Sequence, residues 1–255
     1  MRHGIQLCTL GAYADPRETV RAAVAAEEAG WEALLVWDHL AWASMGAPSA
    51  DPWVTLGACA AVTSRILLGT AVTPLPRRRP QVVAQQLASL SLASDGRVVF
   101  GAGTGVREEL ERFGEEGGDR HRGALLDEGL AVVSSLLAGE HLEHHGAHYV
   151  VDGATLAPLP VRPIPIWIGG NSNAALRRAR TYDGWLADSS DRERNLFSPD
   201  EIAARAHELD DLCFIGYSDQ ADLGAYARAG VTWWIENVWG DPPRVLDRIA
   251  AGPPR

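Results

Sequence analysis

The sequence has 255 residues, of which 46% are apolar, and it carries a formal net charge of −10 with an isoelectric point of about 5.2. The acidic balance opposes binding to DNA, RNA or anionic membranes, and the absence of any apolar run of about 18 residues excludes a membrane-spanning helix. Three widely spaced cysteines without a Cys-x-x-Cys pair argue against a disulfide framework and predict a cytoplasmic protein, and the lack of lysine excludes Schiff-base chemistry.

In chain order, eight short apolar runs are predicted to form strands, and each is followed by a helical pattern. Several runs are apolar at consecutive positions, which is typical of a sheet that is covered on both faces. Eight such units in about 250 residues predict an α/β fold with a single (βα)₈ TIM barrel, organised as one domain over residues 1–255. The predicted strands are 5–10, 33–37, 66–72, 98–101, 164–168, 184–187, 212–217 and 231–236.

Helix boundaries are marked by an acid or serine followed by proline, as in Asp15-Pro16 and Ser198-Pro199, because these residues cap and begin helices. Residues 141–154 alternate polar and apolar side chains around Gly146, which predicts a β-hairpin before the fifth strand. The stretch 202–223 is short, and this leaves open whether the seventh strand is regular.

In a (βα)₈ barrel the active site lies just after the carboxyl ends of the strands. Asp38 and His39 follow the second predicted strand, where a histidine can move protons and an adjacent carboxylate can orient it. These two residues are our candidate catalytic pair. The alternative is a strand-end histidine that only satisfies backbone groups of its loop.

The third predicted strand is followed by small residues and then by the arginines at 77–79. The small residues allow a flat ligand or another backbone to approach closely. The arginines are expected to attract an anionic cofactor tail or substrate, and a salt-bridged surface loop is the alternative. The residues concerned are Thr70, Ala71, Val72, Thr73, Arg77, Arg78 and Arg79.

Glycine-rich turns follow the next two predicted strands. The first lacks the full dinucleotide-binding spacing and indicates close packing against a ligand. The second precedes a helix over 173–182 and predicts an anion cradle made by backbone N–H groups, and an ordinary tight strand-to-helix turn is the alternative. Polar residues at the ends of strands six and eight are expected to line the pocket. The expected cofactor contacts are Gly103, Thr104, Glu109, Gly169, Gly170 and Asn171, and the expected pocket walls are Asp188 and Glu236.

The predicted hairpin carries four histidines, at 141, 144, 145 and 148. Their spacing is not that of a helical His-x-x-x-His pair, and neither a carboxylate nor a cysteine is expected to complete a ligand set. We therefore expect no metal site.

Several segments, taken in order, resemble luciferase-like monooxygenases, with a weaker similarity near residues 229–234. The resemblance implies a (βα)₈ barrel that binds a reduced flavin-type cofactor, either FMN or the deazaflavin coenzyme F420. It also implies a small-molecule substrate, a homodimer, and a separate reductase that supplies the cofactor. The segments are EEAGWEALLVWDHL (27–40), LGTAVTP (68–74), DGRVVFGAG (95–103), PIWIGG (165–170) and DGW (183–185).

By the same resemblance, His39 lies beside the redox ring as proton donor or acceptor, and residues 70–73 form a bulge with a non-proline cis peptide that backs the ring. Gly169, Gly170 and Asn171 resemble the phosphate-binding turn. The expected activity is an oxidoreductase that uses hydride transfer or oxygenation. The alternatives are a non-catalytic flavin-binding barrel and a metal-dependent hydrolase on the same fold.

Overall fold

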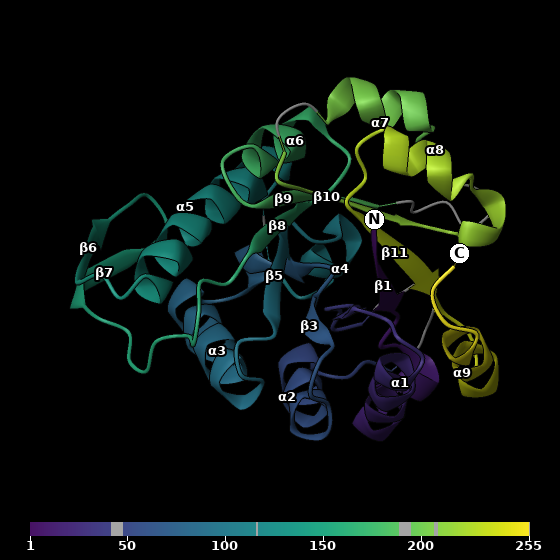
Figure 1. The fold of residues 1–255 in the computed structure, drawn as a ribbon. Coiled ribbons are helices and arrows are strands. Elements are labelled where there is room, and N and C mark those ends of the chain that lie inside the picture. The colour runs from purple at the N-terminus through teal and green to yellow at the C-terminus, as the bar shows by residue number, and fades with distance from the viewer. Residues whose placement is uncertain (42–47, 116, 189–194, 207–208, 255) are drawn as a thin grey trace.

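Parallel strands close into a barrel in the computed structural model, which describes residues 1–41, 48–115, 117–188, 195–206 and 209–254. The strand order is β3-β2-β1-β11-β10-β9-β8-β5, and pairing between β3 and β5 closes the ring. The predicted (βα)₈ barrel is therefore confirmed (Figure 1). The barrel strands are β1 (Arg2–Leu7), β2 (Ala33–Val36), β3 (Leu67–Thr70), β5 (Val98–Gly103), β8 (Ile166–Gly169), β9 (Gly184–Asp188), β10 (Asp211–Gly216) and β11 (Trp233–Val238).

Helices surround the strands as an outer ring, as Figure 1 shows in a view along the barrel. Asp15, Asp51 and Ser198 cap the helices that follow them, and each of these helices has proline in its first turn, as the sequence predicts. Within the described ranges, no helix is both long and apolar enough to cross a membrane. The helices are α1 (Pro16–Glu28), α2 (Pro52–Val62), α3 (Pro80–Ala93), α4 (Arg107–Arg112), α5 (Asp119–Leu137), α6 (Asn173–Ala179), α7 (Pro199–Arg205), α8 (Leu223–Arg228) and α9 (Pro242–Ala250).

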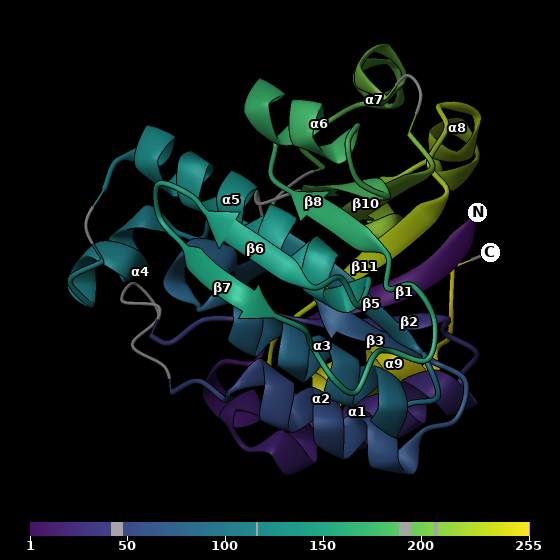
Figure 2. The ribbon, with the colours of Figure 1, turned by 90° about the vertical axis from the view of Figure 1, so that its left-hand side faces the viewer.

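The predicted hairpin is formed by β6 (Leu142–His145) and β7 (Val150–Ala154), which lie outside the barrel against α5 (Figure 2). Glu128 on α5 accepts hydrogen bonds from the backbone N–H groups of His148 and Tyr149 and contacts the His144 ring at 3.0 Å. This single carboxylate therefore anchors the hairpin to the outer ring.

The apolar core has two parts. One lies between the strands and the helices, and the other lies inside the barrel, where Trp167 and Trp233 meet edge to face with ring centroids 5.4 Å apart. Side chains alternate between these two environments along each strand, so the last inward-facing residue of a strand lies at the mouth of the barrel.

Several strands differ in their bounds from expectation: β1 covers Arg2–Leu7 rather than residues 5–10, and β11 covers Trp233–Val238 rather than residues 231–236. The doubtful seventh strand, β10, is regular and pairs with both β9 and β11, so the short segment before it does not open the barrel wall. The third strand ends at Thr70 rather than at residue 72, and the chain resumes as β4 (Thr73–Pro74) after a cis Ala71–Val72 peptide.

Candidate active site

A cavity of about 370 Å³ lies at the carboxyl ends of the strands, where this fold places its active sites. Apolar groups and small residues form most of its wall, and a few polar side chains face into it. The described residues that line it include Gln6, Trp37, Asp38, His39, Ala71, Val72, Pro74, Gly103, Thr104, Gly105, Val106, Gly169, Gly170, Asn171, Leu186, Asp188 and Ile215.

Val72 forms one wall of this cavity, and glycines on two neighbouring strands make room for it. A Cβ atom added to Gly103 would lie 2.6 Å from the Cγ2 atom of Val72, and one added to Gly169 would lie 2.4 Å from its Cγ1 atom. Such contacts are closer than packed atoms allow, so positions 103 and 169 require glycine for Val72 to keep its place. The glycines therefore accept a side chain of the protein as well as bordering the cavity.

Thr70 and Thr73 do not line the cavity, which corrects their expected role as cofactor contacts. Both are fully buried; the Thr70 hydroxyl donates to the Gly101 carbonyl at 2.9 Å, and the Thr73 hydroxyl lies 3.0 Å from that of Thr70. They hold β3 and β4 against β5 and so fix the position of the residues between them.

His39 is oriented by Glu109, which lies 70 residues away in the sequence at the start of α4. The Nδ1 atom of His39 is 3.1 Å from the Glu109 carboxylate, and the backbone N–H groups of Leu40 and Ala41 donate to the same carboxylate. Glu109 is only 3% exposed and does not border the cavity, so its expected role as a cofactor contact is replaced by one in positioning His39.

Burial would raise the pKa of Glu109, but hydrogen bonds from His39 and the Ala41 N–H, with the positive charges of His39 and Arg77, outweigh it and lower the pKa to about 2. An ionised carboxylate only accepts hydrogen bonds, so the Nδ1 atom of His39 carries a proton. Of the two ring nitrogens, Nε2 is then the one that can accept a proton.

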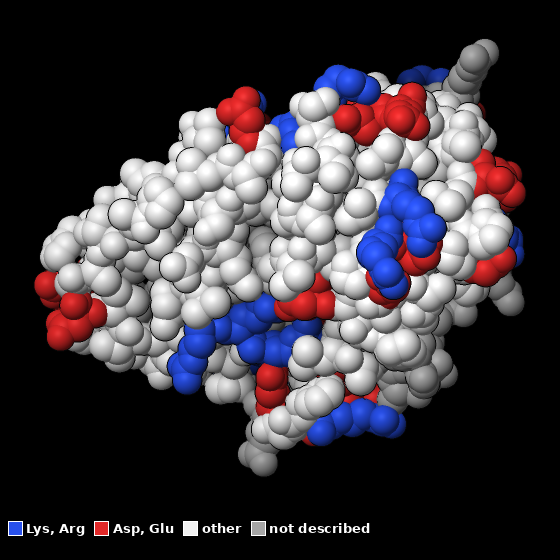
Figure 3. Space-filling model, turned by 90° about the horizontal axis from the view of Figure 1, so that it is seen from below, with Lys and Arg blue, Asp and Glu red and all other residues white. Residues whose placement is uncertain are grey.

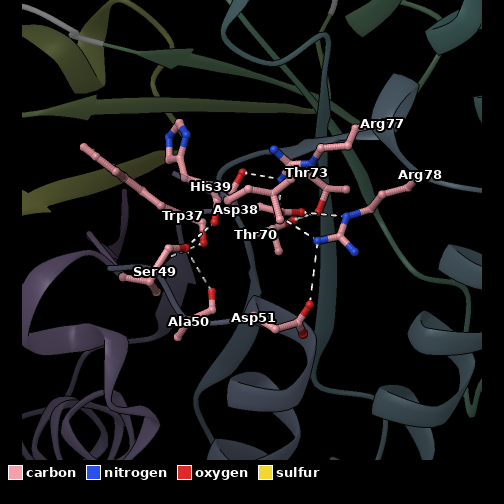
Figure 4. Close-up of polar contacts among 12 residues, drawn as sticks. Trp37, Asp38, His39, Ser49, Ala50, Asp51, Thr70, Thr73, Arg77 and Arg78 are labelled. Atoms are coloured by element: carbon pink, nitrogen blue, oxygen red, sulfur yellow. Dashed lines mark hydrogen bonds and ion pairs between the residues drawn. The ribbon is translucent and has the colours of Figure 1, made fainter. Parts of the chain in front are cut away.

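Asp38 is bound by two arginines rather than by the adjacent histidine. Arg77 and Arg78 donate to its carboxylate at 2.6 to 3.0 Å, and Figure 4 shows the His39 ring directed away from this cluster. Successive residues of an extended chain point to opposite sides, so Asp38 and His39 face different partners. The expectation that Asp38 orients His39 is therefore wrong.

Arg77 and Arg78 are held by these carboxylates, and none of the three arginines is among the described residues that line the cavity, which corrects the expectation that they bind an anionic ligand there. Arg77 bridges Asp38 and Glu109 and is almost fully buried, whereas Arg79 is exposed. On the face shown in Figure 3, basic side chains lie beside acidic ones. Arg77 and Arg78 thus form salt bridges, as the alternative prediction for this loop had it.

The turn before α6 faces the cavity with Gly169, Gly170 and Asn171. Gly170 adopts a φ of +118°, a conformation that favours glycine, and Ser172 caps the helix by accepting from the Ala175 N–H. The Asn171 side chain exchanges two hydrogen bonds with the backbone of Asp188. These contacts join the ends of β8 and β9 into one rigid rim.

Two acidic residues that were expected to line one pocket are placed apart. Asp188 borders the cavity, and burial raises its pKa to about 6. Glu236 lies outside this cavity, where it accepts from the Trp234 indole at 2.9 Å and pairs with Arg248. Among the described residues that line the cavity, Glu236 does not appear.

Gln6 is a cavity residue that sequence reasoning missed. It lies on β1, is 3% exposed, and donates from Nε2 to the Ala71 carbonyl at 3.0 Å. Its Oε1 atom is buried without a hydrogen-bond partner. In the sequence, Gln6 could have been noticed as an isolated polar residue between Ile5 and Leu7 in an otherwise apolar strand.

The hairpin histidines do not gather at one point, since His144 faces Glu128 while His145 is exposed. Two carboxylates do lie near His145, which corrects the expectation that none would: ligand atoms of Glu143, His145 and Asp152 lie within 4.8 Å of one another. All three are exposed, and acidic groups often cluster on a surface without binding metal.

The family model for luciferase-like monooxygenases matches residues 4–218. An F420-dependent glucose-6-phosphate dehydrogenase of Beutenbergia cavernae is 38% identical over 197 residues, which cover 75% of this chain and 58% of that protein. An F420-dependent hydroxymycolic acid dehydrogenase of Mycobacterium tuberculosis is 36% identical over 176 residues, covering 68% and 49%. The chain thus spans about half of the length of these relatives.

Solved structures share the fold at low sequence identity. An F420-dependent secondary alcohol dehydrogenase in complex with an F420–acetone adduct superposes with a TM-score of 0.80 at 18% identity, over 96% of both chains. A type II Baeyer–Villiger monooxygenase from Pseudomonas putida in complex with FMN superposes with a TM-score of 0.66 at 17% identity, over 84% of this chain and 67% of the other.

Proposed function

Because the chain belongs to the luciferase-like monooxygenase family, we propose that it is an oxidoreductase that uses coenzyme F420 to move a hydride to or from a small organic substrate. The observation that carries the proposal is the His39–Glu109 pair at the edge of the cavity. The similarity to named F420-dependent enzymes favours the deazaflavin over FMN.

The residues around the cavity suit a flat ring with an anionic tail. The cis Ala71–Val72 segment offers a smooth apolar wall, and the Gly170 turn leads into the amino end of α6, where backbone N–H groups favour a phosphate. The unpaired Oε1 atom of Gln6 offers an acceptor at the barrel interior. Bound there, the coenzyme would supply the hydride chemistry.

The protein supplies the proton chemistry through His39. When an alcohol carbon loses a hydride, its hydroxyl proton passes to the Nε2 atom of His39 and a carbonyl group forms; reduction of a carbonyl runs in reverse. Glu109 holds the ring in the required tautomer and stabilises the imidazolium, and the buried Arg77 balances that carboxylate. The expected homodimer and a separate reductase stay predictions.

The test replaces His39 by alanine. We expect His39→Ala to lower turnover by about 10² to 10⁴-fold, the usual contribution of a general acid or base, while F420 binding measured by fluorescence stays unchanged. His141→Ala, on the exposed hairpin, is the matched control and should keep full activity. Equal turnover in the His39 variant and the parent would contradict the proposal and favour a non-catalytic cofactor-binding barrel.

A further inference from the structure

We infer that Arg77 is a positioning residue for the proton chemistry of His39. The inference rests on the proposed function and deepens it, because it identifies what holds the His39 ring and keeps it able to accept a proton. Arg77 ends the 3₁₀ helix η2 (Leu75–Arg77), which follows the cis Ala71–Val72 peptide and belongs to a different βα unit from His39. Its side chain is only 5% exposed, and it acts on His39 through two neighbouring groups.

The first of these groups is the carboxylate of Glu109, each oxygen of which accepts from two donors. The Oε1 atom accepts from the backbone N–H groups of Leu40 and Ala41. The Oε2 atom lies 2.9 Å from the Nη1 atom of Arg77 and 3.1 Å from the Nδ1 atom of His39. An ionised carboxylate has about four acceptor sites, so these contacts fix its orientation and place Arg77 on the oxygen that holds the ring.

The second group is Asp38, whose carbonyl belongs to the peptide that leads into His39. The Nη2 atom of Arg77 donates to this carbonyl at 2.9 Å and to the Asp38 carboxylate at 2.6 Å. The guanidinium group is a rigid plane, so its two terminal nitrogens keep a fixed separation. One side chain therefore holds both the backbone before His39 and the carboxylate to which its ring is bound.

The positive charge of Arg77 also affects the protonation of the ring. An ionised carboxylate 3.1 Å from a histidine favours the imidazolium form, and a ring that already carries both protons cannot accept the hydroxyl proton of a substrate. Arg77 contacts the same oxygen of Glu109 and opposes the imidazolium form, while the hydrogen bond that orients the ring is kept. Arg77 thus leaves His39 oriented and able to accept a proton.

Other charged groups lie near this network within the described part of the chain. Arg78 offers the sharpest comparison, because it also binds the carboxylate of Asp38, whereas its described ion-pair partners are Asp38 and Asp51 rather than Glu109. Glu115 interacts electrostatically with Arg77 and Glu109, and Asp188 lines the same cavity as His39. If Arg77 acted only by stabilising Asp38, the two arginines would be equivalent.

The test follows the His39 ring by NMR as the pH is changed, in the protein without coenzyme, with the His39 signal identified by its loss in His39→Gln. We expect the His39 ring of Arg77→Met to hold its proton about tenfold more tightly, so that its titration midpoint rises by about one pH unit. Arg78→Met is the matched control, and its midpoint should correspond to a change of no more than about twofold. Equal shifts in the two variants, or no shift in Arg77→Met, would overturn the inference.

A second variant keeps the test decisive where Arg77→Met fails to fold, since methionine leaves two buried carboxylates with fewer partners. Arg77→Lys keeps the positive charge, but an ammonium group is a single point that does not reproduce the two-sided contact of the guanidinium. We expect its His39 ring to hold the proton about twofold to threefold more tightly than in the parent. A His39 titration identical to that of the parent would contradict the assignment.

Failure of this inference is distinguishable from failure of the proposed function, because the NMR titration requires no coenzyme. F420 titrated into the parent protein, followed by fluorescence, reports the cofactor site separately. If F420 does not bind, the proposed function fails whatever the His39 titration shows. If F420 binds and Arg77→Met and Arg77→Lys leave the His39 titration unchanged, only the role assigned to Arg77 fails.

Discussion

At the residue scale, the cavity holds two carboxyl-bearing residues in opposite settings. Asp38 is 2% exposed and is neutralised by Arg77 and Arg78, while Asp188 has burial without a described cationic partner. Glu109 lies behind the cavity and resembles Asp38, because its negative charge is stabilised by Arg77 and His39. The same residue class therefore serves as scaffold in one place and as ligand-facing group in another.

Asp188 should make the stability of the protein depend on pH. Its folded-state pKa of about 6 lies above the ordinary value of 3.8, so its stabilising contribution is complete below pH 3.8 and is lost as pH rises through 6. We expect Asp188→Asn to gain stability over the parent between pH 5 and pH 8, by up to about 3 kcal/mol for a shift of roughly two units. Urea unfolding of both proteins at these pH values measures the gain.

The exposed residue Asp152 provides the control, because Asp152→Asn should track the parent at both pH values. A gain for Asp188→Asn that is the same at pH 5 and pH 8 would show that burial of the carboxylate is not its cause.

At the element scale, the cavity wall depends on close approach between β8 and the segment that joins β3 to β4. The Cβ atom of an alanine at Gly169 would lie 2.4 Å from the Cγ1 atom of Val72, with no strain from its own backbone conformation. We expect Gly169→Ala to cost about 1 to 3 kcal/mol of unfolding free energy and to weaken F420 binding, because Val72 is pushed from its place.

A double-mutant cycle tests this cause. Val72→Ala in the Gly169→Ala background removes the colliding methyl groups and should recover part of the lost stability, whereas independent effects would simply add. Gly57→Ala in α2, where nothing lies within 4 Å of the new Cβ atom, is the matched control and should be neutral or slightly stabilising.

Element boundaries show what local sequence could and could not predict. Proline with a preceding cap residue marks the starts of α1, α2 and α7, because capping is a local interaction of neighbouring residues. The end of β3 was placed two residues late, since an apolar run does not reveal that the Ala71–Val72 peptide is cis. The resemblance, and not the run, anticipated the cis bond.

At the scale of the whole molecule, the repeated alternation of apolar runs and amphipathic segments was enough to predict the barrel, and the barrel then placed His39, Gly170 and Asp188 around one cavity. Pairings across the fold were not predictable in this way. Glu109 reaches His39 from another βα unit, and sequence neighbours alone had suggested Asp38. Such contacts depend on the three-dimensional register of the strands.

The choice of coenzyme depends on several parts of the barrel at once. The apolar wall, the turn before α6 and the His39–Glu109 pair all lie at one cavity. The most direct measurement is a titration of the purified protein with coenzyme F420 and, separately, with FMN, each followed by fluorescence. We expect saturable, tight binding of F420 and no comparable binding of FMN. Tight binding of FMN without binding of F420 would contradict it.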